Sequence, residues 1–135
     1  MTVRAEWDNT QKTIMRLTFE GAWTWDEYFT SAAFVNQQII AENHVVDVIV
    51  DLTANNIMPS GALTQGKKAM IAKPANNGIT ILVGVNPVLQ GFYKMFSGLY
   101  QGIIRSKKVN MVMAATMEAA YKILEAERMK NVSQE

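Results

Sequence analysis

The chain has 135 residues and is 49% hydrophobic, which is enough for one domain with a substantial apolar core. It contains no cysteine, so a disulfide framework, a thiol nucleophile and a cysteine metal cluster are excluded. The formal net charge of +1 gives no reason to expect nucleic acid as a partner. No apolar run is long enough to span a membrane and no apolar signal segment is visible, so we expect a cytoplasmic protein.

The N-terminal part predicts two strands and a helix. Residues 2–8 and 12–20 are expected as strands joined by a turn, because "TIMRLTFEG" alternates between an apolar and a polar face. This alternation predicts that the second strand is half-buried. A helix is expected from Thr24 to about Asn43, because Thr24 and Glu27 have the spacing of a capping box.

The rest of the chain alternates between apolar strands and helices. Strands are predicted at 45–52, 78–85 and 109–116, which are apolar and rich in β-branched residues. Helices are predicted from Ser60 to about Ala72, from Asn86 through Tyr100 or beyond, and from Thr116 to about Lys130.

This element order, ββαβαβαβα, predicts a single α/β domain over residues 1–130, with a frayed tail at 131–135. We expect a mixed, mostly parallel five-stranded sheet with four helices. Strands that alternate with helices give parallel pairs through right-handed crossovers. The first two strands, with their short turn, are the expected antiparallel pair.

The order of elements, together with "VVDVIVDLTANNIMPSGAL" (45–63) and more weakly "VMAATMEAAYKIL" (112–124), resembles the STAS domain family. That family includes bacterial anti-sigma factor antagonists and the cytoplasmic tails of sulfate transporters. The resemblance implies a non-catalytic regulatory protein that binds an anti-sigma-type or related kinase-like protein. It also implies a switch, because the family is phosphorylated on a serine at a helix N-terminus.

Counted without gaps from Asp51, Ser60 falls on the phosphorylated serine of the family motif. Pro59 replaces the motif aspartate, and Gly61 replaces its second serine. A shift of one residue would instead place Pro59 on the phosphorylated position. Two roles therefore stay open for Ser60, a phosphorylation switch and a simple helix cap.

Polar residues gather where the predicted strands end. Ligands of open α/β sheets bind at the carboxyl ends of the strands, so these residues form a candidate surface for a partner or ligand. We include Asp51, Thr53, Asn55, Asn56, Pro59, Gly61 and Asn86. They favour hydrogen bonding over acid–base catalysis. His44 and Asp51 should lie at opposite ends of one strand, which excludes a triad with Ser60.

The helix that starts at Asn86 carries a second apolar stripe beyond the one needed to dock it on a sheet. It includes Phe92, Tyr93, Met95, Phe96 and Tyr100. The stripe could form a homodimer interface, line a pocket for an apolar ligand or lie in a deep core. The alternative function is therefore a small-molecule or lipid carrier of similar topology. We expect no catalytic residues, no metal site and no cofactor.

Overall fold

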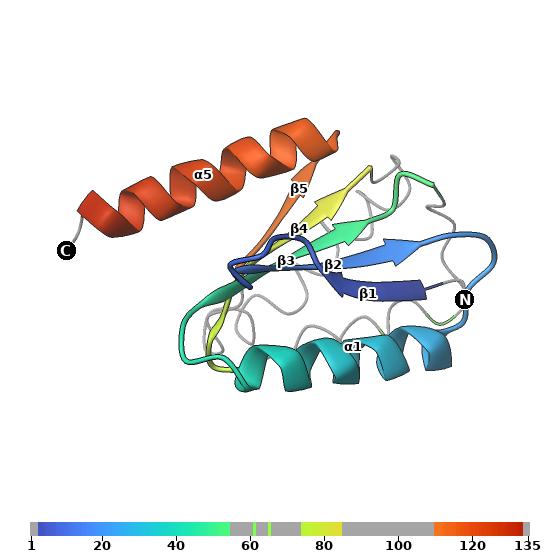
Figure 1. The fold of residues 1–135 in the computed structure, drawn as a ribbon. Coiled ribbons are helices and arrows are strands. Elements are labelled where there is room, and N and C mark those ends of the chain that lie inside the picture. Colours follow the sequence, from blue (N-terminus) through green and yellow to red (C-terminus); the bar gives the residue numbers. More distant parts are fainter. Residues whose placement is uncertain (1–2, 55–60, 62–64, 66–73, 85–109, 134–135) are drawn as a thin grey trace.

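A computed structural model describes residues 3–54, 61, 65, 74–84 and 110–133. Within these residues the chain forms five strands and two helices, which keep the labels of Figure 1. The strands are β1 (Val3–Trp7), β2 (Ile14–Phe19), β3 (Val46–Asp51), β4 (Asn77–Val83) and β5 (Asn110–Ala114), and the helices are α1 (Trp25–Ile40) and α5 (Met117–Ser133).

The strands form one sheet in the order β1-β2-β3-β4-β5, in which β1 and β2 pair antiparallel and the other pairs are parallel. The predicted mixed, mostly parallel sheet is therefore confirmed. The described residues contain two helices where we expected four. Of the helix predicted at 60–72 only Gly61 and Gln65 are described, and the helix predicted from Asn86 lies on residues that are not described. Helix α5 runs to Ser133, beyond its expected end near Lys130.

Helix α1 covers one face of the sheet (Figure 1). Thr24 and Glu27 form the predicted capping box, which fixes the start of the helix. Val35 and Ile39 of α1 then pack into an apolar cluster with strand residues such as Met15. Several aromatic rings pack against one another near the start of α1. Neighbouring ring centroids are 4.7–6.4 Å apart among Phe19, Trp23, Trp25, Tyr28 and Phe29.

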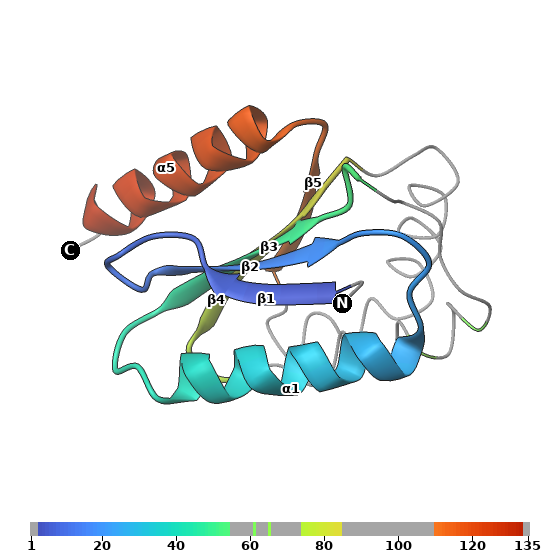
Figure 2. The ribbon, with the colours of Figure 1, turned by 45° about the vertical axis from the view of Figure 1, so that its right-hand side comes forward.

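Helix α5 lies on the opposite face, which Figure 2 shows from a second direction. Its buried residues Ala120 and Leu124 pack in a second apolar cluster with Ile14, Ile49 and other strand residues. The prediction that β2 is half-buried was therefore wrong. Its apolar alternation describes the α1 face correctly, but α5 also buries Ile14 on the other face.

Polar contacts connect α5 to the turn between β1 and β2. The Tyr121 hydroxyl donates to the Asp8 carboxylate at 2.7 and 2.9 Å, and Arg128 Nη2 donates to Thr13 Oγ1 at 2.7 Å. These contacts join residues more than a hundred positions apart. They hold the C-terminal helix over the sheet in one orientation.

Candidate functional site

The carboxyl ends of three parallel strands lie side by side, as the sequence predicted for the candidate surface. Asp51 at the end of β3 pairs with Val83 at the end of β4, and Val83 pairs with Ala114 at the end of β5. The backbone pairing continues past the strand ends, because Leu52 N–H donates to the Val83 carbonyl at 2.9 Å and Gly84 N–H to the Ala114 carbonyl at 3.0 Å. The start of the following loop is therefore fixed to the sheet.

Asp51 and Thr53 form the first turn of this loop. Asp51 Oδ1 accepts hydrogen bonds from the Thr53 backbone N–H at 3.0 Å and from the Thr53 hydroxyl at 2.5 Å. An aspartate that binds the backbone two residues later forms an Asx turn, which sets the direction of the chain. The structure thus brings together two of the predicted site residues, which form this turn through their mutual hydrogen bonds.

Gly84 packs against this turn, a role that the sequence reading missed. Its φ of +77° lies in the left-handed region that favours glycine. A Cβ at this position would come within 3.0 Å of Thr53 Cα and 3.1 Å of Thr53 N. The glycine at the end of the apolar run "ITILVG" was the available signal, because glycine in such a place often marks a close backbone approach.

Gly61 is described on the far side of the loop. Its φ is +85°, and its carbonyl accepts a hydrogen bond from Gln65 N–H at 3.0 Å. Gln65 is itself helical. The helix start that we expected at Ser60 lies outside the described residues and stays a prediction.

The remaining predicted site residues lie outside the described part of the chain, so their roles stay predictions. In the loop and the next connection these are Asn55, Asn56, Pro59, Ser60 and Asn86, and in the apolar stripe they are Phe92, Tyr93, Met95, Phe96 and Tyr100.

The opposite end of β3 holds a buried acid that we had not singled out. Asp47 is 8% exposed, and its Oδ1 accepts a hydrogen bond from Ile79 N–H at 2.9 Å. Arg128 Nη2 lies 4.0 Å from its other oxygen. Burial raises the pKa of Asp47, while the Ile79 hydrogen bond and Arg128 act in the opposite direction. An aspartate inside an otherwise apolar strand was the sequence signal.

Asp47 has a structural role, because its side chain accepts a backbone hydrogen bond where the pairing of β3 and β4 is irregular. The register between the two strands shifts between Val46 and Val48, and the carboxylate binds the backbone N–H that this region offers. His44 lies at the same end, where its Nε2 is 2.8 Å from the Lys12 carbonyl. His44 precedes β3 and Asp51 ends it, so the two side chains lie at opposite ends of the strand, as expected from the sequence.

A third polar group lies on the α5 side of the β1–β2 hairpin. Arg16 Nη1 is 3.1 Å from Asp8 Oδ1, and Arg16 Nη2 is 3.3 Å from Glu6 Oε1. Asp8 also accepts the two bonds from Tyr121. Both carboxylates therefore have ion-pair or hydrogen-bond partners, and these contacts connect the β1–β2 hairpin to α5.

The described residues contain no group of three or more acidic or histidine side chains that could hold a metal ion. Within the same residues, no helix has the length and apolar character needed to cross a membrane. A scan against family models found no match to the sequence, and a comparison with curated proteins also found none.

Proposed function

We propose that this protein is a STAS-like regulatory protein of the cytoplasm that works by reversible association with another protein. The proposed fold adds two helices, at 60–72 and 87–104, to those described. By resemblance, the partner is an anti-sigma-type or related kinase-like protein. The observation that carries the proposal is the fixed edge where β3, β4 and β5 end and where Asp51 and Thr53 form the first turn after β3.

The chemistry of this edge favours binding over catalysis. The Asp51 oxygen that faces Thr53 is engaged in two hydrogen bonds, so this carboxylate positions the backbone. The loop that follows carries the amides of Asn55 and Asn56, which can donate and accept hydrogen bonds but cannot transfer protons at neutral pH. A rigid base with an amide-rich loop is suited to recognition of a partner surface.

Ser60 is the proposed switch of this association. It directly precedes Gly61, whose carbonyl begins an i+4 hydrogen bond with Gln65. Backbone N–H groups at a helix start attract anions, so a phosphate on Ser60 would be stabilised locally. It would also add roughly −1.5 to −2 charges to the partner-facing loop. Phosphorylation is therefore expected to release the partner or to change which partner binds.

Affinity capture from a lysate of the native host tests the switch. We expect the full chain and Ser60→Ala to capture the same regulatory protein, and Ser60→Asp to lose it. Ser133→Asp, which places the same charge at the end of α5, is the control and should bind normally. Equal capture by all these variants, or no partner for any of them, would contradict the proposal.

The alternative function is a carrier of an apolar small molecule or lipid. The observation in its favour is Trp23, which is 6% exposed and whose Nε1 has no hydrogen-bond partner in the described structure. A buried N–H without an acceptor costs about 1–3 kcal/mol, which a ligand oxygen could offset. The rings of Phe19, Trp25 and Tyr28 surround Trp23. Burial raises the pKa of Tyr28 to about 12.

Native mass spectrometry of the protein from its own host distinguishes the two functions. A lipid-sized added mass that is lost after solvent extraction, and that falls in Trp23→Phe, would favour the carrier. A phosphate-sized addition on Ser60, or a co-purified regulatory protein, would favour the switch.

A further inference from the structure

The outer edge of β1 has features of a surface that pairs with a second copy of the chain. β1 is the first strand in the sheet order, so one of its two edges has no strand partner among the described residues. Figure 2 shows this edge along α1. An unpaired edge presents a row of backbone donors and acceptors that another strand can use.

The hydrogen-bond pattern with β2 determines which backbone groups face outward. Asp8 N–H donates to the Ile14 carbonyl at 2.8 Å, and this pair continues the β1–β2 register by one step beyond Trp7 and Met15. Hydrogen-bonded and non-hydrogen-bonded pairs alternate in antiparallel strands. Glu6 and Arg4 therefore direct their backbone groups to β2, whereas those of Val3, Ala5 and Trp7 point to the free edge.

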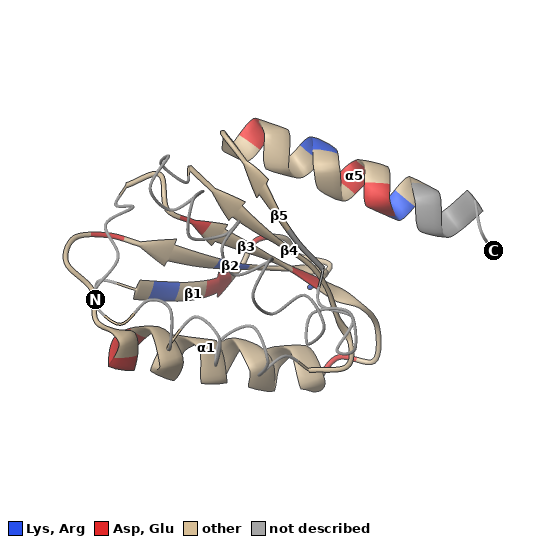
Figure 3. Ribbon diagram, turned by 180° about the vertical axis from the view of Figure 1, so that it is seen from behind, with Lys and Arg blue, Asp and Glu red and all other residues tan. Residues whose placement is uncertain are grey.

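The side chains of β1 are arranged symmetrically about Ala5. The strand reads Val-Arg-Ala-Glu-Trp, with Arg4 before the centre and Glu6 after it. Figure 3 shows the basic and the acidic position along β1. If two copies pair antiparallel about Ala5, each Arg4 lies opposite Glu6 of the second copy. The same axis places Ala5 opposite Ala5 and Val3 opposite Trp7, the residues whose backbone groups point outward.

We propose that the protein forms a homodimer through antiparallel pairing of β1, with the two-fold axis at Ala5. The phase of the backbone hydrogen bonds allows a two-fold axis at Arg4, Ala5 or Glu6, because each of these axes places outward-facing residues opposite one another. The order of the charges selects Ala5, since an axis at Arg4 or Glu6 would place two like charges directly opposite each other. The charged pairs would occupy the non-hydrogen-bonded positions, where side chains approach most closely.

Contacts within each chain would extend the charge pattern across the joined sheet. Arg4 Nη2 lies 2.6 Å from Glu20 Oε1, and Arg16 Nη2 lies 3.3 Å from Glu6 Oε1. A row of alternating sign would therefore run from Glu20 through Arg4 to Glu6 and Arg16 of the second copy. The side chains of Arg4 and Glu20 are about half exposed in the single chain, so they are accessible for such pairing.

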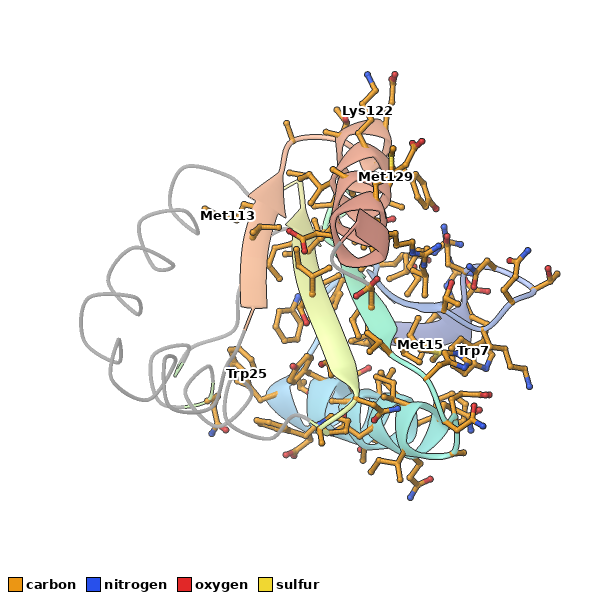
Figure 4. All side chains as sticks on the ribbon, turned by 90° about the vertical axis from the view of Figure 1, so that its left-hand side faces the viewer. Trp7, Met15, Trp25, Met113, Lys122 and Met129 are labelled. Atoms are coloured by element: carbon orange, nitrogen blue, oxygen red, sulfur yellow. The ribbon has the colours of Figure 1, made fainter. Side chains whose placement is uncertain are left out.

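Helix α1 offers an apolar contact on the same side. Figure 4 places Trp25 on the side of α1 toward β5 and Trp7 on the side of the free edge. Phe34 follows Trp25 by about two and a half helical turns, so it lies on the opposite flank of α1, toward that edge. Phe34 is 46% exposed. In the proposed dimer the two α1 helices come together below the joined strands, where this ring would be covered.

Charge complementation between variants gives a specific test, measured by analytical ultracentrifugation of the full chain. Arg4→Glu alone and Glu6→Arg alone each put like charges opposite one another, so each should weaken the dimer about tenfold or more. An equimolar mixture should form a heterodimer, because the two acidic side chains of one variant then face the two basic side chains of the other. Mixing should therefore restore association that neither variant shows alone.

Amide hydrogen exchange of the unmodified chain gives a second test without substitutions. The amides of Ala5 and Trp7 should exchange rapidly in dilute protein and slowly in concentrated protein. The amides of Arg4 and Glu6, which face β2, are internal controls and should stay protected at both concentrations. A chain that remains monomeric, or a dimer that Tyr93→Lys dissociates while Arg4→Glu and the Ala5 amide are unaffected, would overturn the proposal.

Discussion

The two aspartates of β3 lie near opposite ends of the strand and have different roles. Asp47 and Asp51 lie four residues apart on the face that α5 partly covers. Asp47 is buried and binds the backbone of β4 and an arginine of α5, whereas Asp51 is partly exposed and binds its own loop. The same side chain therefore holds the sheet together at one end and directs a candidate binding loop at the other.

The largest effect is expected for Gly78→Ala at the Asp47 end. A Cβ at Gly78 would overlap Asp47 Oδ1 and lie 2.8 Å from Val45 Cγ1. We expect the free energy of unfolding to fall by about 3 kcal/mol, measured by urea denaturation. Adding Asp47→Ala should recover part of this loss by removing one of the two overlaps. A Gly78→Ala variant as stable as the parent would contradict this packing.

Gly84→Ala is expected to have the next largest effect, at the Asp51 end. It combines a left-handed backbone with a contact to the Thr53 backbone, so we expect a loss of about 2 kcal/mol. Gly84→Asn separates the two causes, because asparagine tolerates the left-handed conformation but still carries a Cβ. If the contact dominates, both variants lose similar stability, and if the conformation dominates, asparagine recovers most of it.

Asp47→Ala should destabilise the protein by about 1.5 kcal/mol, because the Ile79 N–H loses its acceptor. Asp47→Asn keeps an acceptor but does not titrate, so its stability relative to the parent should depend on pH. The raised pKa means that the folded chain binds the Asp47 proton more tightly than the unfolded chain, so stability falls as pH rises above 3.8 through the folded value. The stability of Asp47→Asn relative to the parent should therefore increase over this range. A difference that is constant with pH would argue against the burial of this carboxylate.

Asp51→Ala should cost the least stability, about 0.5–1 kcal/mol, because its hydrogen bonds lie within one exposed turn. Its effect on partner capture should be larger than its effect on folding, since the loop loses its fixed direction. Thr53→Val, which keeps the backbone N–H bond and removes the hydroxyl bond, should have an intermediate effect on capture. Normal capture by Asp51→Ala would separate this turn from function.

The overall sheet could be predicted because each of its signals is local. The period-two pattern of β2, the apolar runs of β3, β4 and β5, and the capping box at Thr24 all depend on neighbouring residues. The burial of Ile14 could not be predicted from β2 alone, because it depends on α5, far along the chain.

The candidate site was predicted only where strand ends determine it. Asp51 followed from the end of an apolar run, and Thr53 followed from its place in the loop. The close contact of Gly84 with Thr53 lies between the residues that follow β4 and β3. Predicting it would have required knowledge of how these two strands are paired. Asp47 was overlooked because an apolar composition suggested a uniformly apolar strand, and its hydrogen bond depends on an irregular step in the neighbouring strand.

The strand order has a consequence for how the protein can fold during synthesis. Each strand pairs with the strand that precedes it in the chain, so the sheet can grow from β1 to β5 as the ribosome releases the chain. Tyr121 and Arg128 then reach back to Asp8 and Thr13, which are synthesised more than a hundred residues earlier. Helix α5 thus packs on the sheet after all five described strands have been synthesised, and a nascent chain that stops before α5 would expose the isoleucine-rich face that this helix covers.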